Sequence, residues 1–262
     1  MPSFALYSIV DHTEPSKLFE LIHQREINIE FGKRYESPGF TQMVKSDGGL
    51  HGFVITAIST SYRELISAED GPVAQIKKSS LLAHAEFGLH NNIFYIGNPR
   101  VAAFRDYVLG TLGKNVKLER IWFSPEAFSH LDKTYVSKSH SLRQIRHPGD
   151  STRRIRYEID PAEESAMSQA KNLYWDPNLV EHIEVLVEHN NDFFPITFYV
   201  NGIIRLDSQK LPGGTERIVL LRQIINLSED LYQQYPPKKI RTARISQERK
   251  RGEDASAIGL SE

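Results

Sequence analysis

The chain has no cysteine in its 262 residues. That absence excludes a disulfide-based scaffold, zinc sites with cysteine ligands, iron–sulfur clusters and catalysis by a thiol. The sequence also has no apolar run long enough to cross a bilayer, and residues 1–16 lack the basic and apolar regions of an export signal. We therefore expect a cytoplasmic protein that makes no contact with membranes.

The chain has almost no net charge, with a formal value of −1 at pH 7. Any attraction to nucleic acid must therefore come from local patches rather than from the whole molecule. The sequence also lacks the phosphate-binding loop of ATPases, the glycine fingerprint of dinucleotide enzymes, the H-E-x-x-H helix of zinc proteases and the G-x-S-x-G nucleophile turn. These absences disfavour all four enzyme classes, and we expect no cofactor.

The clearest structural signals lie in residues 80–123. Apolar and polar residues alternate between Ser80 and His90, and this period of two is typical of a half-buried strand. Asn91-Asn92 suits a tight turn, because asparagine tolerates positive φ. A short apolar strand over residues 93–96 follows.

A change of period after this second strand predicts a helix. Asn98 is suited to cap its N-terminus, Pro99 to occupy its first position and Gly113 to end it. An apolar stripe between them recurs at three- and four-residue spacing and is formed by Val101, Phe104, Val108 and Leu112. A strand over residues 116–123 and a helix that begins at Ser124-Pro125 complete a ββαβα order.

The whole pattern predicts an α+β protein with two mixed, largely antiparallel sheet units, helices packed on one face and a basic, disordered C-terminal tail. Polar composition suggests the boundaries. We expect an N-terminal unit, a linker or mobile basic loop, a C-terminal unit and a tail, over residues 1–132, 133–152, 153–235 and 236–262.

Several elements within these units have specific signals. Strands over residues 62–68 and 73–78 would flank a turn at Glu69-Asp70-Gly71-Pro72. A helix is expected over residues 160–173, and a hairpin turn at Asn201-Gly202. The last expected element is a helix from Thr215 to about Tyr235.

Three polar side chains share one face of the strand over residues 80–90, namely His84, Glu86 and His90. Imidazole and carboxylate groups arranged in this way suit general acid–base catalysis, or metal binding with a further ligand. His84 and Glu86 would lie about 7 Å apart and flank a site. The same pattern is also explained by the solvated face of a half-buried strand. If the chain is an enzyme, these residues form the predicted catalytic set, and a nuclease is the expected class.

A second acidic set lies on the strand over residues 182–189, where Glu184 and Glu188 share a face with His182. Metal-dependent nucleases place acids on strands in this manner, because a cation offsets their repulsion. The acid-x-Lys step that usually accompanies such acids occurs only in the tail, at Glu248-Arg249-Lys250. Solvated strand charges therefore also explain this pair.

A basic run is the third candidate site. Between residues 138 and 156 one acid, Asp150, stands against six basic residues: Lys138, Arg143, Arg146, Arg153, Arg154 and Arg156. Arginine and lysine at this density are suited to phosphate contacts whose affinity falls as salt rises. A solvated loop is the alternative explanation.

The sequence favours a module that binds nucleic acid, DNA or RNA, or another polyanion, through residues 138–156. The alternatives are a nuclease centred on His84, Glu86 and His90 or on Glu184 and Glu188, and a protein-interaction subunit of a larger assembly. A compact, cysteine-free chain with a basic tail would suit an antiviral defence assembly.

Overall fold

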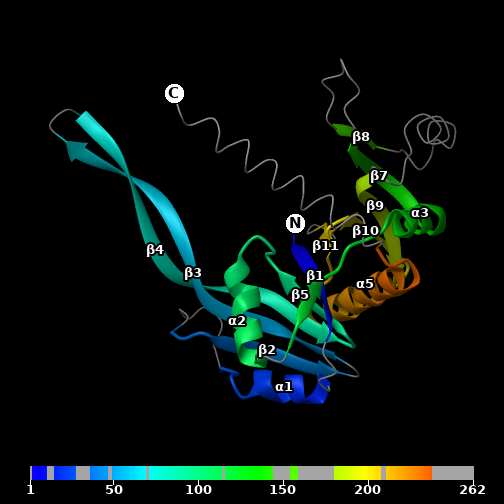
Figure 1. Ribbon diagram of the computed structural model, residues 1–262, viewed down its shortest axis with the longest axis horizontal. Helices are drawn as coiled ribbons and strands as arrows, with labels where there is room; N and C mark the ends of the chain where they lie inside the picture. Colours follow the sequence, from blue (N-terminus) through cyan, green and yellow to red (C-terminus); the bar gives the residue numbers. More distant parts are fainter. Residues whose placement is uncertain are drawn as a thin grey trace. The chain divides into compact units, whose positions relative to one another are not determined.

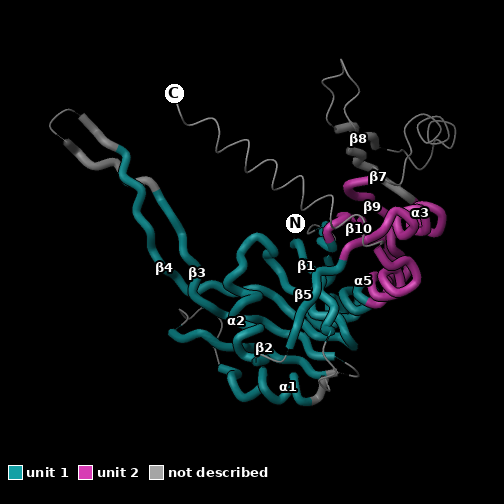
Figure 2. The backbone as a smooth tube through the Cα atoms, in the orientation of Figure 1, with its two compact units in different colours: residues 1–121, 202–225 teal, residues 122–201, 226–262 magenta. Residues whose placement is uncertain are grey.

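The computed structural model shows an α+β protein whose strands pair in a largely antiparallel, open arrangement (Figure 1). It describes residues 2–10, 15–27, 36–46, 49–68, 71–113, 116–143, 154–158, 180–207 and 211–237. The chain forms two compact units, each built from two stretches of sequence (Figure 2). Unit 1 comprises Met1–Ile121 and Gly202–Ile225, and unit 2 comprises Trp122–Asn201 and Asn226–Glu262.

Unit 1 is built on antiparallel strands that join distant parts of the sequence. Their order across the sheet is β2 (Gly39–Ser46), β3 (Gly49–Ala68), β4 (Gly71–His90), β5 (Ile93–Gly97), β1 (Ser3–Ile9) and β11 (Ile203–Leu206). The short strand β6 (Leu118–Arg120) also pairs with β1. The N-terminal strand is therefore central, and it pairs with segments that lie about 90 to 200 residues away in sequence.

Helices lie on both faces of the unit 1 sheet, so the expectation that they pack on one face is wrong here. One face packs against α1 (Pro15–His23) and α2 (Ala102–Leu112) around the buried Phe87. The neighbouring residue, Glu86, points to the opposite face and contacts Arg217 in the first half of α5 (Gly214–Gln234). Successive side chains of a strand face opposite sides, so both faces of β4 are covered at this point.

The helix α2 begins later than the sequence suggests. Asn98 has a φ of 51°, and its backbone carbonyl accepts a hydrogen bond from the Val101 backbone N–H at 3.0 Å. These residues form a turn, and the helix begins at Ala102 without a side-chain cap. The predicted stop at Gly113, which has a φ of 94°, is confirmed. Of the predicted stripe, Phe104, Val108 and Leu112 are buried, whereas Val101 precedes the helix and is half-buried.

The strands β3 and β4 are longer than the sequence suggests. The expected short strands over residues 62–68 and 73–78 are the far ends of two 20-residue strands. The register runs without a shift from Gly49 opposite His90 to Ala68 opposite Gly71. No glycine or proline interrupts residues 53–68 or 73–87, so neither strand has a residue that would break the pairing.

The described part of unit 2 contains four antiparallel strands in the order β10 (Asp192–Tyr199), β9 (Val180–His189), β7 (Val136–Arg143) and β8 (Arg154–Glu158). The helix α3 (Pro125–Thr134) begins as expected, with the Ser124 hydroxyl accepting a hydrogen bond from the Ala127 N–H at 3.1 Å. The buried face of β9 is the predicted one, formed by Ile183, Val185 and Val187.

One segment of unit 2 differs from the sequence expectation. Residues 136–143, expected in a linker or mobile loop, form the strand β7 between β8 and β9. Pairing on both sides supplies the backbone hydrogen bonds that its polar composition does not reveal. Residues 144–152, the helix expected over residues 160–173 and tail residues 238–262 lie outside the described residues.

Candidate functional site

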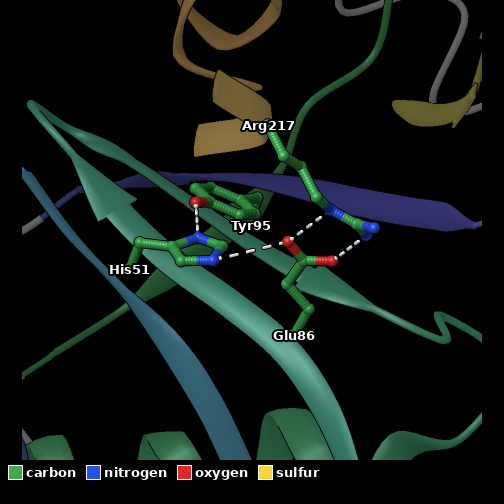
Figure 3. Close-up of polar contacts among 4 residues, drawn as sticks. All are labelled: His51, Glu86, Tyr95 and Arg217. Atoms are coloured by element: carbon green, nitrogen blue, oxygen red, sulfur yellow. Dashed lines mark hydrogen bonds and ion pairs between the residues drawn. The ribbon is translucent and has the colours of Figure 1, made fainter. Parts of the chain in front are cut away.

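Four side chains of unit 1 form a buried polar network (Figure 3). They come from four elements: His51 from β3, Glu86 from β4, Tyr95 from β5 and Arg217 from α5. His51, Glu86 and Tyr95 are each at least 92% buried. Polar groups at that depth are costly unless they are hydrogen-bonded to one another.

The strand register brings His51 and Tyr95 together above a glycine. Gly88 is the direct partner of His51 on one side and of Tyr95 on the other. A Cβ added at Gly88 would lie 2.3 Å from the Tyr95 ring, so only glycine leaves room for it. With that space open, the His51 and Tyr95 rings stack with their centroids 6.2 Å apart.

The contacts within the network fix the positions of its protons. The His51 Nδ1 atom lies 2.7 Å from the Tyr95 hydroxyl, and its Nε2 atom lies 3.4 Å from Glu86 Oε1. A carboxylate only accepts hydrogen bonds, so Nε2 of a neutral His51 carries the hydrogen and Nδ1 accepts from the Tyr95 hydroxyl. This tautomer gives both ring nitrogens a suitable neighbour.

Arg217 completes the network by binding both oxygens of Glu86. Its Nε atom donates to Oε1 at 3.2 Å, and its terminal Nη2 atom donates to Oε2. A bidentate guanidinium–carboxylate pair is a strong and directional contact. It fixes the first half of α5 to the face of β4 opposite the α1 and α2 side.

Burial controls the protonation of the network. Desolvation, aided by the positive charges of Arg217 and Arg222, lowers the pKa of His51 to about 4. Burial raises the pKa of Glu86, and its contacts with Arg217 offset part of that rise. Burial and the Glu86 charge raise the pKa of Tyr95 above its ordinary value. His51 and Tyr95 are therefore neutral at pH 7.

Only one member of the predicted catalytic set belongs to this network. Glu86 is buried and contacts His51 and Arg217, neither of which the sequence analysis identified. His84 is exposed and packs edge-on against Phe53 at 5.8 Å, and His90 is half-buried at the end of β4. The alternation of polar and apolar residues placed Glu86 on the correct face of its strand. It could not identify the contact partners of Glu86, because these come from other elements.

The second acidic set lies on one face of β9, as expected. Glu184 is half-buried and accepts a hydrogen bond from the Thr197 hydroxyl at 3.4 Å, while Glu188 is exposed. His182 packs against the ring of its cross-strand partner Tyr199 at 4.8 Å. Among the described residues, no three histidine, aspartate or glutamate side chains converge to hold a metal ion.

The basic run falls on two paired strands and the segment between them. Lys138 and Arg143 lie in β7, Arg154 and Arg156 lie in β8, and their pairing is antiparallel. Arg143 is the direct partner of Arg154, and Ser141 is the partner of Arg156. The other two members of the set, Arg146 and Arg153, lie outside the described residues.

Neither protein-family models nor curated proteins nor solved structures match this chain. No helix among the described residues has the length and apolar character that crossing a membrane requires. The function must therefore be argued from the residues themselves.

Proposed function

We propose that the protein binds nucleic acid through the hairpin of β7 and β8. The observation that carries this proposal is the direct pairing of Arg143 with Arg154. Like charges in directly opposite cross-strand positions destabilise a sheet. A phosphate group bound beside both arginines would turn that repulsion into two charge-assisted hydrogen bonds.

The position of the hairpin supports this function. The strand β8 ends the strand order of unit 2, and β7 is its only partner among the described strands. Arg154 and Arg156 are two residues apart in an edge strand, a spacing that repeats on one face. Arginine is also the residue best suited to bind phosphate oxygens in pairs.

The buried network argues against the nuclease alternative as the leading proposal. A general base or metal ligand must reach the substrate, whereas Glu86 is only 8% exposed and both of its oxygens bind Arg217. We therefore assign His51, Glu86, Tyr95 and Arg217 to holding α5 on the sheet. A cleavage assay with Mg²⁺ accompanies the binding test so that this choice is examined directly.

The test is fluorescence anisotropy with labelled single-stranded and double-stranded DNA and RNA. If four basic residues each neutralise one phosphate, affinity falls on the order of 100-fold between 50 and 200 mM salt. The double variant Arg143→Ala with Arg154→Ala is expected to weaken binding at least 10-fold, because a lost phosphate contact typically costs more than 1 kcal/mol.

A matched control removes the same charge elsewhere. Arg25 and Arg100 are both exposed residues of unit 1. The double variant Arg25→Ala with Arg100→Ala is expected to keep the affinity within about 2-fold of that of the unchanged protein, because exposed charges far from a site are screened. Equal losses in the two double variants, or affinity indifferent to salt, would contradict the proposal. Cleavage abolished by Glu86→Gln would instead favour the nuclease.

A further inference from the structure

The hairpin of β3 and β4 continues as an arm in which, among the described strands, each of the two pairs only with the other (Figure 1). On the β3 side, β2 pairs with residues no farther than Ile55, and on the β4 side β5 pairs only with residues 87–90. We define the arm as residues 56–68 with residues 71–83. Its 13 cross-strand pairs extend about 44 Å at the usual rise per residue.

The arm has little of its own to stabilise it. Two isolated strands are marginally stable in water, and a third strand or an apolar cover is normally needed. Three large apolar residues on the arm are exposed: Ile76 is 65% exposed on one face, and on the other face Tyr62 and Leu81 are 50% and 45% exposed. The latter two lie on the face that also carries Ile58, because Ile58 pairs directly with Leu81 and Tyr62 is four residues further along β3.

The two edges of the arm differ in how they resist pairing with another strand. Natural edge strands are protected by lysine and proline. On β4 the arm carries Pro72 and the adjacent lysines Lys77 and Lys78. On β3, residues 56–68 contain no lysine, proline or glycine, and their two charged residues, Arg63 and Glu64, are of opposite sign. The β4 edge is therefore protected, whereas the β3 edge retains a sequence suited to strand pairing.

From this asymmetry we propose that the β3 edge of the arm pairs antiparallel with the same edge of a second copy of the chain. The four strands would then run β4, β3, β3 and β4 across a twofold axis. Such an interface is isologous, because the same residues serve both copies. It supplies the additional strands that each arm lacks.

Geometry selects one register for this pairing. The free edge spans residues 56–68, and its central residue is Tyr62. Centring on Ser61 would bring Ala68 of the second copy to Val54, a position already occupied by Phe40 of β2. Centring on Arg63 or Glu64 would place like charges in direct opposition, which is unfavourable.

The register about Tyr62 avoids both conflicts. Tyr62 lies opposite Tyr62 of the second copy, and Thr60 lies opposite Glu64. An aromatic cross-strand pair at the axis is a favourable contact. This register covers Tyr62, the one aromatic residue of the arm, and uses the whole free edge without leaving an unpaired overhang.

The first test is the molar mass by light scattering over a range of protein concentrations. The proposal predicts a concentration-dependent rise towards twice the 30.0 kDa chain mass. Tyr62→Lys is expected to shift the dimer dissociation constant upward at least 10-fold, because it places two lysines in direct opposition. The control Ile76→Lys adds the same charge at a more exposed apolar residue of β4 and is expected to leave the dimer intact.

A crosslinking test reports the register itself. Directly opposite residues have Cα atoms about 4.5–5.5 Å apart, which is compatible with a disulfide, and the chain has no cysteine of its own. Under mild oxidation, Tyr62→Cys is expected to crosslink two chains, while Ile76→Cys is not. A protein that stays monomeric at every concentration would overturn the proposal, as would a Tyr62→Lys dimer of unchanged affinity or equal crosslinking at both positions.

Discussion

The hairpin of β3 and β4 has two parts that share one register and differ in their surroundings. At its base, over residues 49–55 and 84–90, β2 or β5 extends the sheet, and Val54, Glu86 and Phe87 are buried. In the arm the same two strands continue with exposed Tyr62 and Ile76. One unbroken backbone register therefore runs from a buried environment at the base into an exposed one in the arm.

Each part contains an ion pair between a glutamate and a basic residue, and the two pairs differ in how far they are exposed to solvent. The base holds Glu86 with Arg217, and Glu86 is 8% exposed; the arm holds Glu64 with Lys77, and both side chains are more than 40% exposed. A buried pair leaves an uncompensated charge when one partner is removed, whereas an exposed pair is replaced by water. We therefore expect the Glu86–Arg217 pair to stabilise the fold and the Glu64–Lys77 pair to contribute little to stability.

The largest expected difference follows from that contrast. Glu86→Ala is expected to lower the free energy of unfolding by about 3 kcal/mol, because Arg217, which is only 30% exposed, and the buried His51 both lose the carboxylate that they contact. Glu64→Ala is expected to lower it by no more than about 1 kcal/mol. Urea unfolding followed by circular dichroism measures both values. Equal losses would mean that the base network does not hold α5 as described.

A smaller effect concerns pH. The pKa of His51 is lowered to about 4 in the folded protein, against an ordinary value of 6.5. The unfolded chain therefore binds the proton more tightly, and stability is full above pH 6.5 and falls as the pH decreases towards 4. The slope from this one group approaches about 1.4 kcal/mol per pH unit.

The measurement that isolates His51 is the free energy of unfolding at pH 7, 6 and 5. His51→Gln is expected to flatten the loss on acidification, while His84→Gln, an exposed histidine on the same hairpin, is expected to retain it. The raised pKa of Glu86 acts in the opposite direction, because a folded state that holds its proton more tightly gains stability as the pH falls. Identical pH profiles for the two variants would refute the assignment to His51.

Local signals predicted much of the fold. The ββαβα order of residues 80–134, the Ser124 cap and the buried face of β9 were all readable, because each depends on residues that are close in sequence. The start of α2 was misplaced, because Asn98 and Pro99 serve a turn whose Asn98 N–H donates to the Ser3 carbonyl of β1. That contact spans 95 residues and leaves no local pattern.

The candidate site was predictable only in part for the same reason. Alternation placed Glu86 on one face of its strand, but His51, Tyr95 and Arg217 come from elements 35, 9 and 131 residues away. Gly88 was the one available signal, since a glycine within an apolar strand indicates close approach of another group. The pairing of Arg143 with Arg154 likewise became visible only with the register of β7 and β8.

The most direct test of the contrast between base and arm is amide hydrogen exchange along β3 at low and high protein concentration. Base amides such as those of Val54 and Ile55, which lie between β2 and β4, are expected to be protected at both concentrations. In residues 56–68, every second amide points away from β4 and should gain protection only at high concentration, as a second copy pairs with that edge. Exchange of these amides that does not change with concentration would contradict the account.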